Sequence, residues 1–431
     1  MERAETRAER ITAGPSAPGA PLDAARADAR AAPPRASPTP AAKRRLGVRI
    51  LLLTAFCFGL GQTVIFAVLP PIAREAGLSE RQVGMIFGVS AVFWVLSSPR
   101  WGRRSDEVGR RPIVLLGLAA FVISMLALTG AVAVAMSGAL TGWAAFGLMA
   151  LTRSGHGAFG AAGPAASQAY IADRSSADDR TSALAGFAAA FGIGTTAGPT
   201  LGAMSAHLGV LAPLVMVALA GLASFVLIWR FVPEATPPRL RGPRAKLSPF
   251  DPRLRATLAY GLLSGFVTAV QLQLIVFYLI DTLGLTQAEG LTIGGAALTI
   301  SAAASLFAQL VLVQRLRPSP RRLMRSAPIL CAIGFVIIAS GDSFAVIAVG
   351  LVLSGLGTGM SYPAFNAAAS LSVGQEEQGG AAGLATAAGA SGFILAPLVA
   401  SALYDGHPSW PFLLGAVVAL AMAGIAWAAR D

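Results

Sequence analysis

Long apolar segments alternate with short polar loops along almost the whole chain. About 20 consecutive apolar residues are enough for a helix to cross the hydrocarbon core of a bilayer. The pattern therefore predicts an all-α membrane protein with twelve transmembrane helices, over residues 48–72, 82–101, 112–136, 142–171, 181–206, 209–232, 255–280, 287–312, 324–341, 343–371, 379–404 and 410–429.

The predicted helices fall into two sets of six, separated by a segment rich in Pro and Arg. Residues at the start of the chain are rich in Ala, Pro and Arg, and such a composition cannot bury enough apolar surface to offset chain entropy. We therefore predict four regions: a disordered cytoplasmic tail at 1–46, an N-terminal six-helix half at 47–232, a cytoplasmic linker loop at 233–254 and a C-terminal six-helix half at 255–431.

The two predicted halves resemble each other in sequence. Ser-Gly-His-Gly at 154–157 matches Ser-Gly-Leu-Gly at 354–357, and Gly-Pro at 198–199 matches Ala-Pro at 396–397. Repeated halves are typical of secondary transporters, whose substrate site lies near the membrane midplane between the repeats. The alternative explanation is that membrane helices use small residues often, so that short matches arise independently.

The placement of charge predicts the orientation of the chain. Charged residues make up only 13% of the sequence, whereas soluble domains contain about 25%. The net charge of +12 could indicate a nucleic-acid partner, but most Lys and Arg lie in loops and tails on one side of the predicted membrane. Only Arg74 and Arg81 lie in loops on the other side. This positive-inside asymmetry predicts cytoplasmic termini and no nucleic-acid partner.

A charged stretch with the pattern Gly-x-x-x-Asp-x-x-Gly-Arg-Arg joins the second and third predicted helices. A carboxylate at such a turn can pair with arginines or cap a neighbouring helix. A pair that forms in one conformation and breaks in another would act as a latch. We therefore predict a gating or charge-relay role for Gly102, Asp106, Gly109, Arg110 and Arg111. A signal for membrane orientation alone is the alternative.

An arginine lies well inside the fourth predicted helix, where it costs about 2.5–3.5 kcal/mol on insertion scales. Such residues usually face a cavity or a partner and mark function. His156 follows Arg153 at i+3 and can share its helix face. We predict that Arg153 and His156 take part in proton coupling. The alternative for His156 is that its side chain is hydrogen-bonded to the helix backbone and has no functional role.

Small residues recur every four positions in the fifth predicted helix, a spacing that lets helices pack closely. Pro199 removes one backbone hydrogen bond and bends the helix. This combination predicts a hinge at Gly194, Gly198, Pro199 and Gly202, with a generic packing face as the alternative.

Scattered polar and aromatic residues on the presumed cavity helices predict a mostly apolar pocket with a few polar groups. Such a lining suits a lipophilic small molecule. The predicted cavity residues are Gln62, Phe66, Gln271, Gln273, Phe277, Tyr362 and Asn366.

No sequence pattern for bond-making chemistry is found. The sequence contains no Walker loop, metal-ligand cluster or catalytic triad, so we predict neither an enzyme nor a cofactor. Cys57 and Cys331 both lie in apolar segments and have no disulfide or metal spacing.

On these motifs, residues 47–429 resemble the major facilitator superfamily, and most of all its twelve-span drug:proton antiporters. Residues 102–111 look like the signature between the second and third helices. Residues 151–160 look like the fourth-helix signature, whose arginine is implicated in proton coupling. Residues 194–202 look like the fifth-helix signature of antiporters. The chain departs from the pattern at Glu107, where a basic residue is usual.

The resemblance implies an exporter of lipophilic small molecules or drugs, driven by proton entry and working by alternating access. It implies a monomer in the bacterial inner membrane, with a small-molecule substrate, protons and membrane lipids as partners. Gln62 stands where relatives carry an acidic residue, so Asp106, Asp281 and His156 remain candidates for the proton carrier. Uptake of a small metabolite, or a non-transporting sensor or lipid-handling role, are the alternatives.

Overall fold

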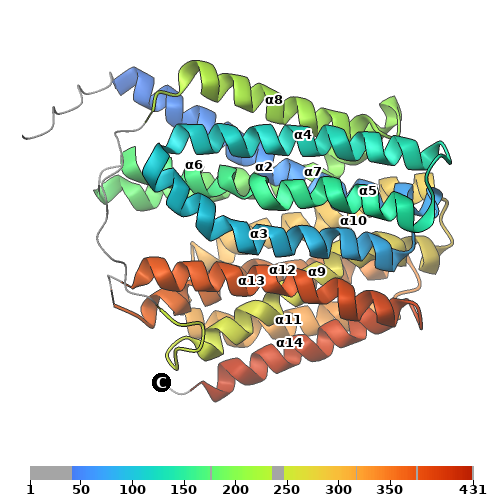
Figure 1. Cartoon of the computed structure of the whole chain (residues 1–431). Helices are drawn as coiled ribbons and strands as arrows, with labels where there is room; N and C mark the ends of the chain where they lie inside the picture. Colours follow the sequence, from blue (N-terminus) through green and yellow to red (C-terminus); the bar gives the residue numbers. More distant parts are fainter. Residues whose placement is uncertain (1–40, 175–176, 235–246, 317, 375–376, 430–431) are drawn as a thin grey trace, which may run out of the picture. The chain divides into compact units, whose positions relative to one another are not determined.

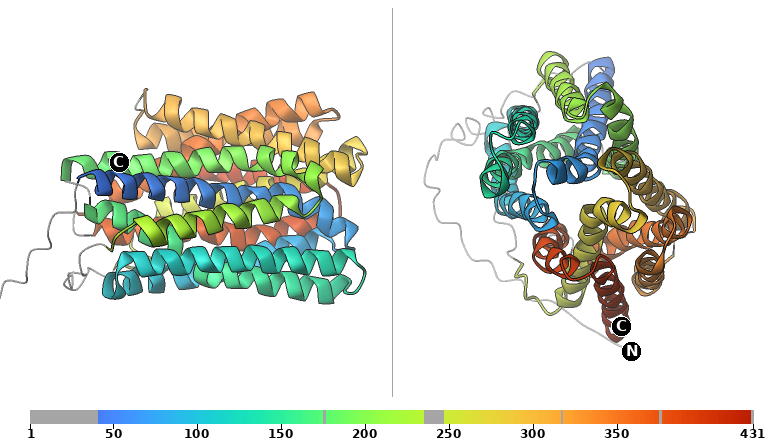
Figure 2. Two further views of the ribbon diagram at one scale, coloured as in Figure 1. Left: turned by 90° about the horizontal axis from the view of Figure 1, so that it is seen from above. Right: turned by 90° about the vertical axis from the view of Figure 1, so that its right-hand side faces the viewer.

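The computed structural model describes residues 41–174, 177–234, 247–316, 318–374 and 377–429. These residues form helices that run roughly parallel to one another (Figures 1 and 2). The elements before the linker are α2 (Ala41–Glu75), α3 (Glu80–Val108), α4 (Arg110–Met136), α5 (Gly142–Gly155), the π-helical η2 (His156–Gly160), α6 (Ala162–Arg174), α7 (Ala177–Ser205), the 3₁₀ turn η3 (Ala206–Leu208) and α8 (Ala212–Phe231).

The elements after the linker complete the bundle. They are α9 (Arg255–Leu283), α10 (Gln287–Phe307), the π-helical η4 (Ala308–Val313), α11 (Pro320–Ser340), α12 (Phe344–Leu371), α13 (Gln378–Tyr404) and α14 (Trp410–Ala428).

Ten helices in the described part of the chain are long and apolar enough to cross a membrane. The other two predicted spans are helical as well. A π-helical turn divides one of them into α5, η2 and α6, and the other is α7, which is rich in Gly and Thr. The predicted all-α membrane fold with twelve long helices is therefore confirmed.

Helix packing brings together segments from both sides of the linker. The most extensive contacts before the linker are those of α2 with α7 and of α4 with α8, and after it those of α11 with α12 and of α13 with α9. Helices α3 and α13 pack against each other, as do α7 and α10, so these pairs connect the two predicted halves. The division into halves stays a prediction, and residues 1–40 and 235–246 lie outside the described residues.

The charged stretch at residues 102–111, which was predicted to join two helices as a turn, is almost entirely helical. Helix α3 continues to Val108 and α4 begins at Arg110, so that Gly109 alone separates them. Gly109 has a φ of 106°, a conformation that L side chains rarely adopt. A single glycine thus reverses the chain direction between α3 and α4, where the charged sequence suggested a longer turn.

Candidate functional site

A cavity of about 220 Å³ lies among helices α2, α7, α9, α10, α12 and α13. None of the described residues that line it is charged. Two phenylalanines, Phe66 and Phe393, contribute aromatic surface. The surface of the cavity is mostly apolar, and hydroxyl and amide side chains reach it from Gln62, Thr63, Thr195, Thr196, Thr268, Gln271, Ser301, Ser305, Gln309 and Thr358.

Three of the predicted cavity residues, Gln62, Phe66 and Gln271, line this cavity. The buried Gln271 donates from Nε2 to Ser301 Oγ at 2.5 Å. Its Oε1 has no hydrogen-bond partner among the described residues. A buried amide oxygen without a donor is costly, so Gln271 carries an unused acceptor in the wall of the cavity.

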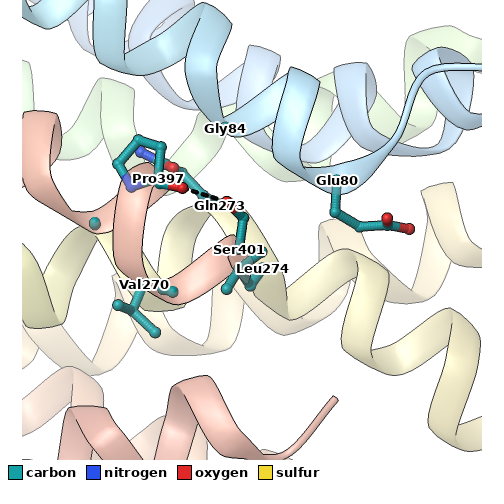
Figure 3. A pocket seen from close by; sticks show the side chains of 9 residues that line it. Glu80, Gly84, Val270, Gln273, Leu274, Pro397 and Ser401 are labelled. Carbon is teal, nitrogen blue, oxygen red and sulfur yellow. Dashed lines mark hydrogen bonds between the residues drawn. The ribbon is translucent and has the colours of Figure 1, made fainter. Parts of the chain in front are cut away.

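The other predicted cavity residues lie elsewhere. Gln273 lines a smaller pocket of about 10 Å³ beside Gly84 and Pro397 (Figure 3). Phe277 is fully buried. Tyr362 and Asn366 lie on α12, where Asn366 Nδ2 donates to the Tyr362 carbonyl at 2.8 Å, and neither lines the larger cavity.

The polar face of α10 and η4 is one part of the cavity that the sequence analysis missed. Ser301 and Ser305 on α10 and Gln309 in η4 follow one another at intervals of four residues. Residues at this spacing share one face of a helix. The spacing was therefore a usable signal, although serine in a membrane helix is also common at packing contacts.

Arg153 and His156 lie together in a different place, at the junction of α5 and η2. Arg153 is 6% exposed, and its Nε has no partner among the described residues. The His156 ring lies 5.6 Å from the rings of Trp94 and Phe121, and its Nδ1 is likewise unpartnered. Neither residue lines the cavity.

The π-helical turn at His156–Gly160 brings this region close to α3. A Cβ on Gly157 would lie 2.2 Å from the Ser90 carbonyl oxygen, and Ser90 Oγ donates to the Arg153 carbonyl at 2.9 Å. Single π-helical turns occur often at functional sites. The structure thus places the buried arginine and histidine beside a local irregularity of the helix.

The turn between α3 and α4 is held by a carboxylate that the sequence analysis did not single out. Glu234 Oε1 accepts the backbone N–H groups of Arg110 at 3.1 Å and Arg111 at 3.3 Å. These groups belong to the first turn of α4, where N–H groups lack helical partners and attract negative charge. Arg110 Nε also donates to Asp173 Oδ2 at 2.9 Å. A Cβ on Gly109 would lie 2.9 Å from Glu234 Cδ.

The remaining predicted residues of this turn differ in their surroundings. The Asp106 side chain lies outside the described residues. A Cβ added to Gly102 would meet nothing within 4 Å. Only the second glycine of the motif is therefore required by close contact in this structure.

Two of the predicted hinge residues, Gly194 and Gly198, pack tightly against α2. A Cβ on Gly194 would lie 2.1 Å from the Phe56 carbonyl oxygen, and one on Gly198 would lie 2.2 Å from Thr63 Oγ1. Gly202 is less constrained, because its nearest neighbour would be Val64 Cγ1 at 3.2 Å.

The same contact satisfies a carbonyl group that proline leaves free. Pro199 has no N–H, so the carbonyl of Thr195, four residues earlier, loses its usual helical donor. Thr63 Oγ1 donates to this carbonyl at 3.0 Å. Helix α2 thus supports α7 at its proline, and Thr63 and Thr195 also line the cavity.

Comparison with known proteins agrees with this architecture. The model of the Major Facilitator Superfamily matches residues 51–396 and 295–431. The class G tetracycline resistance protein of Vibrio anguillarum is 28% identical over 393 residues, covering 86% of this chain and 94% of that protein. The class D protein of Salmonella ordonez is 32% identical over 186 residues, covering 42% of this chain and 43% of that protein. This second match spans less than half the length of the relative.

Solved structures share the fold. The human organic anion transporter MFSD10 (TETRAN) has a TM-score of 0.66 and 21% identity, covering 89% of this chain and 99% of that chain. A bacterial homolog of the human lysosomal transporter Spinster, in an inward-facing and occupied conformation, has a TM-score of 0.71 and 15% identity, covering 91% and 97%. At sequence identities this low, these similarities show a shared fold alone.

Proposed function

We propose that this chain, which belongs to the Major Facilitator Superfamily, is a proton-coupled exporter of amphiphilic small molecules. It is a multi-pass membrane protein with the fold of a transporter. The observation that carries the proposal is the uncharged, hydrogen-bonding cavity among helices from both sides of the linker. Similarity to a tetracycline resistance protein over 86% of the chain supports export as the direction.

The lining of the cavity narrows the class of substrate. An ion with an uncompensated charge would lose hydration there without meeting a counter-charge, which is costly. Hydroxyl and amide groups can instead pair with the carbonyl and hydroxyl groups of a neutral or zwitterionic compound. Phe66 and Phe393 offer apolar surface to its rings. The substrate we propose is therefore lipophilic but rich in hydrogen-bonding groups.

Coupling and movement complete the proposal. The two halves, 47–232 and 255–431, would rock about the cavity and expose it alternately to the two sides. Arg153 is a buried cation with an unpartnered Nε. A proton that binds or leaves nearby would therefore change the electrostatic energy of Arg153 strongly. We propose that Arg153 couples protonation to substrate release, with His156 beside it. The setting we propose is the bacterial inner membrane, with a monomer embedded in lipid and both termini cytoplasmic.

Uptake of a small polar metabolite is the second candidate. The number of hydroxyl and amide groups around the cavity favours it, because fixed polar groups give specificity for a polar solute. The two functions differ in the direction of net movement under the same proton gradient.

The test is the accumulation of tetracycline and of lipophilic dyes in cells with and without this protein, before and after a protonophore. We expect lower accumulation with the protein and loss of this difference after the protonophore. Gln271→Ala should weaken the effect, whereas the matched control Asn366→Ala, outside the cavity, should retain it. Higher accumulation in cells with the protein would overturn export and favour uptake.

A further inference from the structure

One face of helix α3 is turned towards the π-helical turn η2. Ser90, Trp94, Ser97 and Trp101 follow one another at intervals of four, three and four residues. This spacing places side chains on one face of a helix. Helix α3 packs against α5, η2 and α6 (Figure 1). We call these four residues the α3 contact face, because it meets the chain where the fourth predicted span departs from the α-helix.

The α3 contact face donates hydrogen bonds to the backbone of the turn. Ser97 Oγ donates to the Gly157 carbonyl at 3.0 Å, and lies farther, at 3.4 Å, from the carbonyl of Trp94 in its own helix. Trp101 Nε1 donates to the Ala158 carbonyl at 2.6 Å. Both carbonyls belong to η2, where i→i+5 bonds replace the i→i+4 bonds of an α-helix. Donors from α3 therefore stabilise the chain where its hydrogen-bond register changes.

Packing around the turn fixes the side chain of its first residue. The His156 ring lies 5.6 Å from the ring of Trp94 on α3 and 5.6 Å from that of Phe121 on α4. A Cβ on Gly160, the last residue of the turn, would lie 2.7 Å from His156 Nδ1. The absence of a side chain at this position thus makes room for the imidazole.

The helices on both sides of the turn are fixed independently of it. Ser124 Oγ of α4 donates to the Thr152 carbonyl of α5 at 2.7 Å. On α6, a Cβ on Gly163 would lie 2.4 Å from Phe58 Cζ, and one on Gly117 of α4 would lie 2.2 Å from the Gly163 nitrogen. Neither α5 nor α6 can therefore rotate freely. The π turn accommodates one residue more than an α-helix would place between these contacts.

We propose that η2 is the element that positions His156 against Arg153 for proton coupling. Ser97 and Trp101 are positioning residues that hold the turn in its register. Helix α3 also packs against α13 of the other predicted half, so a movement of one half against the other reaches the turn through the same helix. The inference rests on the proposed function, which assigns proton coupling to Arg153 and His156.

The experiment removes one residue from the turn and keeps the flanking helices in register. Phe159 is the residue to delete, because its side chain is 46% exposed. The residue four positions after His156 then becomes Ala161 in place of Gly160, and its Cβ would displace the imidazole. Phe159→Ala is the matched control, because it removes the same side chain and keeps the length of the turn.

Three measurements on the full chain separate positioning from folding. The thermal midpoint in detergent reports folding. In inverted membrane vesicles, where export carries a compound inwards, accumulation of tetracycline driven by a proton gradient reports coupling. Counterflow, the exchange of labelled for unlabelled tetracycline without a gradient, reports alternating access alone.

We expect the deletion variant to keep a thermal midpoint close to that of the parent and to retain counterflow, but to lose gradient-driven accumulation. Phe159→Ala should retain all three. Ser97→Ala and Trp101→Phe each remove one donor. Each should reduce gradient-driven accumulation about threefold, the factor for one hydrogen bond between membrane helices. Ser97→Thr keeps the hydroxyl and should behave like the parent.

A folded deletion variant that accumulates tetracycline as the parent does would overturn the proposal, because the turn would then only accommodate an extra residue. Loss of counterflow together with accumulation would also overturn it, since the role would then be structural. If the deletion variant does not fold, the Ser97 variants decide, and equal accumulation by Ser97→Ala and Ser97→Thr would overturn the proposal. A parent without accumulation or counterflow would instead refute the proposed function, and this inference with it.

Discussion

The contact between Gly198 and Thr63 gives a direct test of how α2 and α7 are held together. In Gly198→Ala the new Cβ would lie 2.2 Å from Thr63 Oγ1 and 2.9 Å from the Leu60 carbonyl oxygen. Ordinary contacts are roughly 3.5–4.0 Å, so either the helices separate or Thr63 rotates. Rotation of Thr63 would break its hydrogen bond to the Thr195 carbonyl.

The magnitude follows from three contributions. Overpacking of this kind costs about 1–3 kcal/mol, and loss of a hydrogen bond between membrane helices costs about 0.6 kcal/mol. Replacing a helical glycine by alanine gains roughly 0.5–1 kcal/mol. The net effect on the free energy of unfolding should be a loss of about 1–3 kcal/mol.

Thermal unfolding in detergent measures this effect against a control on the same helix. A Cβ on Gly186 would meet only Leu52 Cδ2, at 3.9 Å, so Gly186→Ala should be neutral or stabilising. Adding Thr63→Ala to Gly198→Ala removes the closest atom, so the double variant should lose less stability than the two single changes summed. A Gly198→Ala protein as stable as Gly186→Ala would refute the reasoning, as would strict additivity with Thr63→Ala.

Three further predictions use the same kind of comparison. Gly109→Ala should lower the thermal midpoint in detergent, because of the φ of 106°, whereas Gly102→Ala should not. Arg153→Ala should insert at least as well as the parent, because it removes a buried cation, but should abolish protonophore-sensitive export. The exposed Arg253 donates to Glu377 and holds the pKa of that carboxyl below its usual value. The contribution of this pair to the free energy of unfolding is therefore present above the usual pKa of a glutamate and is lost as pH falls through the lowered value. In Arg253→Ala, the free energy of unfolding should depend less on pH in this acid range.

The sequence predicted the helices well because each one carries its own signal. An apolar segment of membrane length needs no distant partner to be identified. The same local pattern predicted a break near Gly109, and only its extent was wrong. It also identified Arg153 as unusual, because a charge inside an apolar run is conspicuous by itself.

The contacts between helices could not be predicted in this way. Arg74 Nη1 donates to Asp281 Oδ1 at 2.6 Å, but the two residues are 207 positions apart, and no local pattern indicates that they meet. Glu234 gives no sign in the sequence that it accepts N–H groups of α4. The π-helical turn at His156–Gly160 was also missed, because a change of hydrogen-bond register leaves the apolar run intact.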